Sequence, residues 1–138
     1  MHIDSIHNGI VIDHITAGRG MEIYKLLHLD HLDSSVAIIK NAPSRKMGKK
    51  DIIKVDADID IDTNVLGYVD PNVTVDIIRN GHLAEKRRVG LPTRLTNVLF
   101  CKNPRCITTT EQELPHVFLL TDPEHRIYRC LYCETKAK

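Results

Sequence analysis

The sequence predicts an α+β protein in two parts, a sheet covered by helices followed by a small all-β domain. Three observations lead to this prediction. Over the first two-thirds of the chain, β-branched runs alternate with two helical patterns. All four cysteines lie in the last third, between Cys101 and Cys133. The segment Val89–Thr93, which separates the two regions, contains Gly and Pro and is typical of a linker.

Length and composition set the limits of this organisation. A chain of 138 residues has room for one small domain and a smaller appendage. Hydrophobic residues make up 42% of it, but aromatics only 4% and Trp is absent, so we expect a core of Ile, Leu and Val. Lys and Arg number 19 against 18 Asp and Glu, and this balance disfavours a protein whose main role is to coat nucleic acid or an anionic membrane.

The N-terminal part begins with a predicted strand, a helix and two further strands. The first strand covers Gly9–Ile15, and the helix covers Met21–Leu29, where apolar residues recur on one helical face. Ser34–Lys40 is a short β-branched run that predicts a buried strand. Asn41–Ser44 contains Pro and predicts a turn, after which Asp51–Val55 predicts a third strand.

The next elements complete a recognisable order. A short helix is predicted at Asn64–Val69, ending before Pro71. An alternating strand starts at Val73, and the Asn80–Gly81 dipeptide predicts a hairpin into a last strand at Leu83–Val89. The resulting βαββαβ order predicts a ferredoxin-like sandwich. An edge or the open face of its sheet would be free to pair with a second copy of the chain.

We place the domain boundary between residues 91 and 92, giving domains 1–91 and 92–138. The second domain shows alternating strand patterns around Asn97–Phe100, Val117–Thr121 and Ile127–Arg129, and no helical period. A domain of about 45 residues is close to the size at which a covalent or metal staple is needed. We therefore expect a zinc ribbon.

The cysteines supply that staple. Cys101 and Cys106 form a CxxxxC pair, and Cys130 and Cys133 a CxxC pair. Two such pairs on tight turns are typical of a structural Zn²⁺ site, whose four thiolates leave no open position for substrate. The alternatives are disulfides or buried thiols that never meet. No signal peptide or membrane-length apolar run is visible, so we expect a cytoplasmic chain with reduced thiols.

Charged residues of the first domain suggest an anion site. In a ferredoxin-like sheet the segments that carry these residues could converge and bind a nucleotide. On the spacing of the charged residues alone, a solvated surface is the simpler interpretation. The sequence has no P-loop, no GxGxxG motif and no Ser or Cys in a nucleophile-elbow motif, so we do not expect an enzyme. The charged residues are Asp13, His14, Lys46, Lys49, Lys50, Lys54, Lys86, Arg87 and Arg88.

Blocks spread along the chain resemble a known family. Gly9–Ile15, Met47–Lys54, Leu91–Pro92 and Asn97–Cys101 occur in the order seen in aspartate carbamoyltransferase regulatory chains. Pro43–Ser44 and the two cysteine pairs, with 23 residues between them, match the same family. The resemblance implies a non-catalytic subunit that controls catalytic chains in pyrimidine biosynthesis.

The resemblance also implies residue roles in the first domain. It would bind CTP as inhibitor and ATP as activator. Asp13 would meet the ribose, Lys54 the base and ribose, and His14 and Lys86 the phosphates. Ile6 and Ile3 would line the base pocket. Gly81 stands where the family leads us to expect an aromatic residue, and Asp76 where it leads us to expect Asn; a carboxylate there opposes triphosphate binding.

For the second domain, the resemblance implies docking on a catalytic chain through Asn103, Arg105, Tyr132 and Glu134. Regulatory dimers would bridge catalytic trimers. Two other functions stay open. One is a zinc-ribbon module that binds nucleic acid, against which stand the neutral net charge and the scarcity of aromatic residues for stacking. The other is a structural bridge that binds the same partner without responding to nucleotides.

Overall fold

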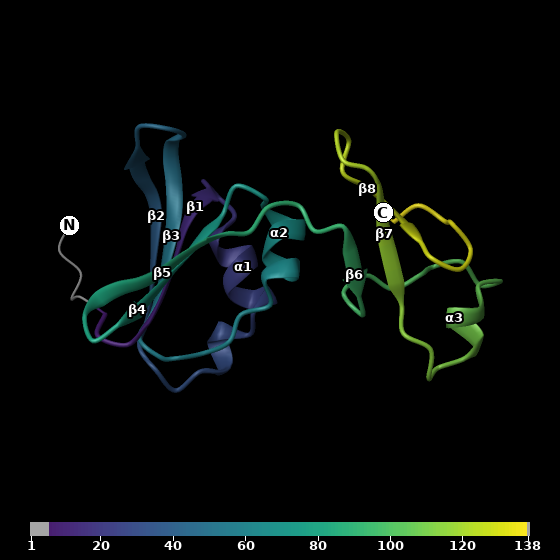
Figure 1. Ribbon diagram of the computed structural model, residues 1–138, viewed down its shortest axis with the longest axis horizontal. Coiled ribbons are helices and arrows are strands. Elements are labelled where there is room, and N and C mark those ends of the chain that lie inside the picture. The colour runs from purple at the N-terminus through teal and green to yellow at the C-terminus, as the bar shows by residue number, and fades with distance from the viewer. Residues whose placement is uncertain (1–5, 138) are drawn as a thin grey trace. The chain divides into compact units, whose positions relative to one another are not determined.

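The computed structural model describes residues 6–137 (Figure 1). The chain divides into two compact units between Gly90 and Leu91. Ile3 lies outside the described residues. Among the described residues, none of the helices combines the length and the apolar character that a membrane span requires.

The first unit is a five-stranded sheet with both of its α-helices packed on one face (Figure 1). The strand order is β2-β3-β1-β4-β5, and every neighbouring pair is antiparallel. Strands β2, β3, β1 and β4 have the order of a ferredoxin-like sandwich, so the predicted α+β class is confirmed. The elements are β1 (Gly9–Thr16), α1 (Gly20–Leu26), the 3₁₀ turn η1 (Leu29–His31), β2 (Val36–Ser44), β3 (Gly48–Val55), α2 (Thr63–Val69), β4 (Thr74–Arg79) and β5 (His82–Arg88).

The core of this unit lies between the sheet and the helices. Its buried members are aliphatic, as the composition predicts: α1 contributes Ile23, α2 contributes Leu66 and Val69, and the strands contribute Ile and Val at alternate positions. Because alternate residues of a strand point to opposite faces, the residues between these positions lie on the other face of the sheet. We call that other face the open face.

The Asn80–Gly81 hairpin is confirmed. Both residues have positive φ, 52° for Asn80 and 76° for Gly81, as a two-residue type I′ turn requires. The turn is tied to the segment before β1, since the Gly81 N–H donates to the carbonyl of His7 at 2.8 Å. The start of β1 and the β4–β5 turn therefore lie side by side.

The predicted turn at 41–44 is wrong. Strand β2 runs through Ser44, and the chain reverses at 45–47. Asn41 instead has a φ of 58° and forms a bulge, where the register with β3 shifts between Ile39 and Ala42. Pro43 is tolerated because β2 is an edge strand, where a missing N–H faces no neighbour.

One buried carboxylate ties three segments of this unit together. Asp51 is fully buried in β3. Its Oδ2 accepts the N–H groups of Gly18 and Gly20, at 3.0 and 2.9 Å, and its Oδ1 accepts that of Asn41 at 3.0 Å. Gly20 must be glycine, since an added Cβ would lie 2.9 Å from the same carboxylate oxygen. Asp51 thus fixes both the start of α1 and the bulge of β2.

We expect Asp51→Asn to lower the free energy of unfolding by about 2 kcal/mol, because the new amide turns donors toward N–H groups that need an acceptor. Urea denaturation of the full chain measures this. Asp58→Asn, at an exposed loop position, is the matched control and should change stability by less than about 0.5 kcal/mol. Equal stability of the two variants would contradict this role of Asp51.

The second unit is a three-stranded antiparallel sheet in the order β6-β7-β8, with one short helix. Its buried residues include Phe118 and Tyr128, so aromatic side chains contribute here where only aliphatic ones were expected. The elements are β6 (Arg94–Thr96), α3 (Ile107–Thr110), β7 (Val117–Asp122) and β8 (Ile127–Cys130).

Two local predictions in this unit are wrong. The segment 97–100 is not a strand, because Asn97 adopts a φ of 58° and ends β6 at Thr96. The helix α3 was not predicted; it is a single turn that starts directly after Cys106 and is too short to give a helical period. The zinc-ribbon prediction is nevertheless consistent with the observed sheet and the four cysteines.

Candidate functional sites

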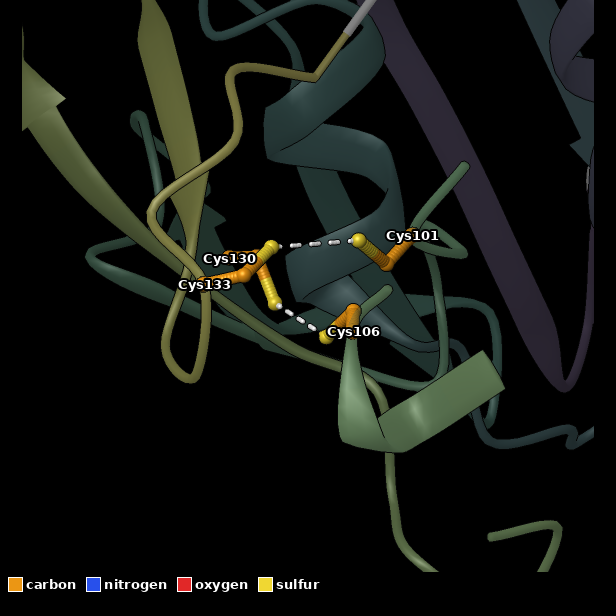
Figure 2. A group of neighbouring side chains, drawn as sticks. All are labelled: Cys101, Cys106, Cys130 and Cys133. Atoms are coloured by element: carbon orange, nitrogen blue, oxygen red, sulfur yellow. Dashed lines mark hydrogen bonds between the residues drawn. The ribbon is translucent and has the colours of Figure 1, made fainter. Parts of the chain in front are cut away.

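Turns and strand ends bring the four cysteines together. Cys106 precedes α3, Cys130 ends β8, and Cys133 lies in the turn that follows β8. Figure 2 shows the four sulfurs facing one another; Cys101 Sγ is 3.5 Å from Cys133 Sγ, and Cys106 Sγ is 3.7 Å from Cys130 Sγ. All four sulfurs lie within 4.8 Å of one another.

This geometry fits a tetrahedral metal. With metal–sulfur bonds of ~2.3 Å, the edges of an S₄ tetrahedron are ~3.8 Å long. The two Sγ–Sγ distances of 3.5 and 3.7 Å are close to that edge and far from a disulfide bond. Cys101, Cys106 and Cys130 are buried and Cys133 is half-buried, so four ligands can enclose an ion away from water.

The electrostatics also favour a cation. Burial, together with the neighbouring thiols, raises the pKa of Cys101 to about 12, and burial raises the pKa of Cys130. The hydrogen bond to Thr135 lowers the pKa of Cys133 to about 6. Four thiolates in one small volume need a positive charge between them. Thr108 Oγ1, 3.1 Å from Cys106 Sγ, supports the sulfurs from outside the cluster.

A second group of metal-type side chains lies on η1. His28, Asp30 and His31 have ligand atoms within 4.8 Å of one another, but all three are exposed. The His31 ring nitrogen is 3.6 Å from Asp30 Oδ2, which is beyond hydrogen-bond distance. Unlike the cysteine cluster, which is enclosed, this group is typical of a polar surface turn.

The open face of the first unit carries a row of register partners across its strands. The row runs from Lys54 of β3 through Val11 of β1 and Asp76 of β4 to Lys86 of β5, each residue pairing with the next. Lys54 lies between the fully buried Ile53 and Val55, so its side chain is on the opposite face. With strands ~4.8 Å apart, the row from Lys54 to Lys86 spans ~14 Å.

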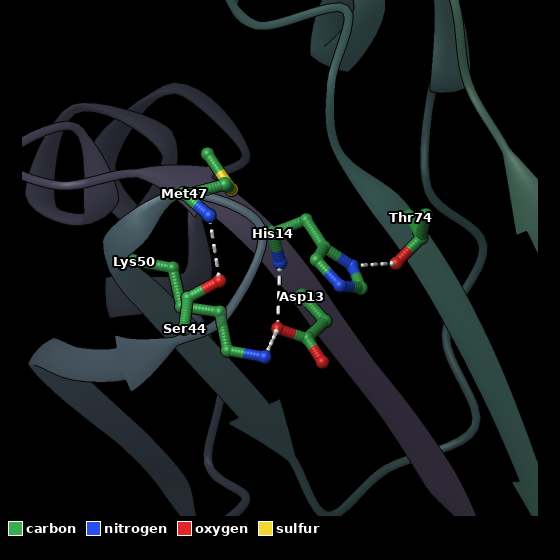
Figure 3. Close-up of polar contacts among 6 residues, drawn as sticks. All are labelled: Asp13, His14, Ser44, Met47, Lys50 and Thr74. Atoms are coloured by element: carbon green, nitrogen blue, oxygen red, sulfur yellow. Dashed lines mark hydrogen bonds and ion pairs between the residues drawn. The ribbon is translucent and has the colours of Figure 1, made fainter.

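A polar network lies at the end of β1 on this face (Figure 3). Asp13 Oδ1 accepts a hydrogen bond from the His14 N–H at 2.6 Å and pairs with Lys50 Nζ at 3.0 Å. Burial opposes ionisation of Asp13, but these contacts outweigh it and lower its pKa. His14 has a φ of 58°, and its Nδ1 lies 2.9 Å from Thr74 Oγ1. The network fixes the His14 ring over β4.

Beside this network lies a depression of about 330 Å³ rich in cationic side chains. Four cationic or titratable basic groups line it, from β1, the β2–β3 turn and β5. Lys86 and Arg88 are two residues apart on β5 and so share a face. An anion with several charges is the ligand that this lining suits. The lining residues are His14, Lys46, Pro71, Asn72, Val73, Thr74, Lys86 and Arg88.

Comparisons with known proteins assign both units of the chain to one family. The family model for the allosteric domain of aspartate carbamoyltransferase regulatory chains matches residues 1–90, and the model for their metal binding domain matches residues 93–138. The chain belongs to this family.

Curated regulatory chains match over almost the whole length. One from Clostridium botulinum is 52% identical over 132 residues, covering 96% of this chain and 90% of the relative. One from Clostridium tetani is 50% identical, covering 96% and 92%. One from Bifidobacterium longum is 44% identical over 138 residues, covering 100% and 99%. The predicted family and the prediction of a non-catalytic subunit are confirmed, and the metal binding domain contains the four-cysteine cluster.

In this regulatory chain, the described residues predicted for an effector site come from β1, β3, β5 and the segment before β1. His14 and Lys86 line the depression, and Asp13 is adjacent to His14. Lys54 lies on the same face, at the opposite end of the register row from Lys86. Ile6 lies beyond the other end of β1, where its Cγ2 would be 2.8 Å from a Cβ added at Gly9.

The sequence had placed Lys46, Lys50 and Arg88 among the basic residues of a possible anion site, but the resemblance gave them no role with the effector. Thr74 was in neither group. Alternation along β5 could have grouped Arg88 with Lys86 and separated both from Arg87. Arg87 indeed lies on the helix-covered face, where it lines a different depression with residues 58–61, and it pairs with Glu85 at 2.9 Å. The contact between His14 and Thr74 had no sequence signal, since it depends on the bulge in β1.

The residues predicted to contact a catalytic chain surround the cysteine cluster. Asn103 is half-buried; its Nδ2 donates to Thr135 Oγ1 at 3.3 Å and its Oδ1 accepts the Arg105 N–H at 3.0 Å. Arg105, Tyr132 and Glu134 are exposed. Asn103 therefore shapes the first cysteine loop, while the other three side chains are available at its surface.

Proposed function

We propose that this regulatory chain senses nucleoside triphosphates on the open face of its first unit and transmits their binding to aspartate carbamoyltransferase catalytic chains in pyrimidine biosynthesis. The observation that carries the proposal is the depression beside β1, where Lys46, Lys86, Arg88 and His14 converge next to the Asp13 carboxylate. Fixed cations suit a polyphosphate, and a carboxylate suits ribose hydroxyls.

The layout supports a ligand lying along β1. The phosphates would meet His14 and Lys86 at one end, and Asp13 would accept hydrogen bonds from the ribose. Lys54 would reach the base and ribose. Ile6 would contact the base near the β4–β5 turn, and Ile3, outside the described residues, is proposed for the same pocket. CTP and ATP are the proposed effectors.

We propose Zn²⁺ as the metal of the cysteine cluster. Zn²⁺ accepts four thiolates in a tetrahedron without a preferred geometry of its own, and such sites are structural. Thiol ligands must stay reduced to hold it, so we also propose a cytoplasmic location.

The second unit is the proposed docking surface for a catalytic chain. Four large hydrophobic side chains are exposed there, and each is the direct sequence neighbour of a cysteine: Phe100, Ile107, Leu131 and Tyr132. Because the sulfurs converge, the metal would hold these side chains in place around one centre. Exposed apolar side chains with Asn103, Arg105 and Glu134 beside them are typical of a protein interface.

Two further elements of the proposal concern assembly. A regulatory dimer would form through the first unit, whose sheet has the edge strands β2 and β5, the latter exposed at every residue. Effector control is then a linkage effect: a nucleotide that binds one state of the assembly better shifts the aspartate affinity, and aspartate shifts nucleotide affinity by the same factor.

Calorimetric titration of the zinc-loaded chain with CTP and with ATP tests whether the chain binds nucleotides. We expect saturable binding of both nucleotides that weakens as salt is added, because exposed cations are screened. A chain that binds neither nucleotide at low salt would contradict an effector site on the open face.

A further inference from the structure

Asp76 has an unusual position on the open face. Its Oδ1 is the one buried side-chain nitrogen or oxygen atom, among residues 6–137, that has no hydrogen-bond partner. The residue itself is half-buried in β4, two positions along the strand from Thr74, which lines the cationic depression. Buried polar atoms are nearly always paired, so an unpaired buried oxygen calls for a physical reason, and its place beside the cationic depression directs that reason to a ligand.

The neighbours of Asp76 do not neutralise it. Lys86 is its register partner on β5, yet no ion pair joins the two in the described part of the chain, and the Lys86 side chain is exposed at the depression. Lys50 of β3 is committed to Asp13 at 3.0 Å. Lys54 lies two strands away, across Val11. The basic groups around Asp76 therefore face outward or toward other partners.

Burial raises the pKa of Asp76, and the charge of Asp13 adds to this effect, while Lys86, His14 and Lys50 oppose it. An arriving polyphosphate adds negative charge at the same place. It also draws Lys86 toward itself, so the carboxylate loses its nearest compensating cation. Protonation removes the repulsion and makes Asp76 a hydrogen-bond donor.

We propose that Asp76 is a specificity-determining residue of the effector site, and that it takes up a proton when a nucleoside triphosphate binds. This inference rests on the proposed function. It predicts that the site prefers a shorter phosphate chain as pH rises, since each added phosphate charge increases the repulsion from an ionised Asp76.

The sign of the pH dependence follows from proton uptake. Affinity for a triphosphate falls as pH rises through the window between the pKa of Asp76 in the free chain and its higher pKa in the complex. The logarithm of the affinity changes by about one for each pH unit when one proton is taken up. For a monophosphate, the slope is smaller because less charge is placed near Asp76.

The test compares the zinc-loaded wild-type chain with Asp76→Asn, titrated calorimetrically with CMP, CDP and CTP from pH 6 to 8.5. Buffers with different ionisation enthalpies report the number of protons taken up. We expect Asp76→Asn to bind CTP on the order of tenfold more tightly at pH 8, with a gain that shrinks for CDP and CMP, and to take up fewer protons. Asp58→Asn removes the same charge on an exposed loop and should match the wild type.

Protonated His14 also favours an anion, so His14→Gln is included; it should weaken binding but keep the proton uptake that depends on Asp76. Asp76→Ser provides a second variant if the first folds poorly, and the thermal midpoint of each free chain is measured. A raised pKa in the folded chain means that ionised Asp76 costs stability above that pKa and nothing below its unfolded value, so Asp76→Asn should melt higher at pH 8.

Equal pH slopes and equal CTP affinities in the wild type and Asp76→Asn would overturn the inference while leaving nucleotide sensing intact. Tight CTP binding only in the presence of added Mg²⁺, without proton uptake, would also overturn it, because a metal ion would then supply the compensating charge. No binding of any nucleotide by either chain would overturn the proposed function and this inference with it.

Discussion

Cys106→Ser should unfold the second unit while the first unit keeps its structure. Cys106 is buried, its sulfur is 3.7 Å from that of Cys130, and it directly precedes α3. The unit has a small core around Leu95, Phe118 and Tyr128. A structural zinc contributes on the order of 10 kcal/mol to the folding of such a domain, more than a core of this size can replace.

Zinc content and heteronuclear NMR of the full chain measure this effect. We expect the bound zinc to fall from one ion per chain to none, and the resonances of residues 91–138 to lose dispersion while those of the first unit persist. Chelation of the wild type should give the same spectrum. Glu113→Gln, an exposed change in the same unit, is the control and should retain the metal. Retained zinc and an unchanged spectrum in Cys106→Ser would contradict a four-cysteine structural site.

The second large effect is expected for the double variant Lys54→Ala and Lys86→Ala, which should abolish nucleotide binding. The two lysines stand at opposite ends of the row across the open face and would hold opposite parts of the ligand. A hydrogen bond to a charged group is worth about 1.5–3 kcal/mol, so losing both corresponds to a loss of affinity of roughly 100-fold or more. Calorimetric titration with CTP and ATP measures it.

A control with the same loss of charge separates local contacts from the general field. Lys25 on α1 and Lys40 on the edge strand β2 are exposed and lie outside the lining of the depression. Replacing both with Ala should weaken nucleotide binding only slightly at moderate salt, because distant exposed charges are screened. If the two double variants lose affinity equally, the ligand is held by net charge and the assigned residues are wrong.

The parts of the structure that depend on local pattern were predictable from sequence. The spacing of the cysteine pairs predicted that the four thiols come together, and the structure places all four sulfurs within 4.8 Å of one another. Asn80–Gly81 identified the hairpin, because both residues tolerate the positive φ that the turn needs. Alternating Ile and Val residues identified the strands of the first unit, although their ends differ by a few residues.

The parts that depend on contacts between distant segments were not predictable. Asn41 and Pro43 have the composition of a turn, but Asp51 captures the Asn41 N–H and extends the strand as a bulge. The bulge in β1 places His14 against Thr74, sixty residues away in sequence. The buried, unpaired oxygen of Asp76 likewise emerges only when β1, β4 and β5 are side by side.

The central claim is that this chain couples nucleotide binding to the activity of a catalytic partner. The most direct test measures the rate of carbamoyl transfer by aspartate carbamoyltransferase catalytic chains against aspartate concentration, with and without the zinc-loaded regulatory chain, adding CTP or ATP. The account predicts co-assembly and a shift of the half-saturating aspartate concentration with each nucleotide. Co-assembly without any shift would reduce the chain to a structural bridge, and failure to bind the catalytic chains would contradict the account as a whole.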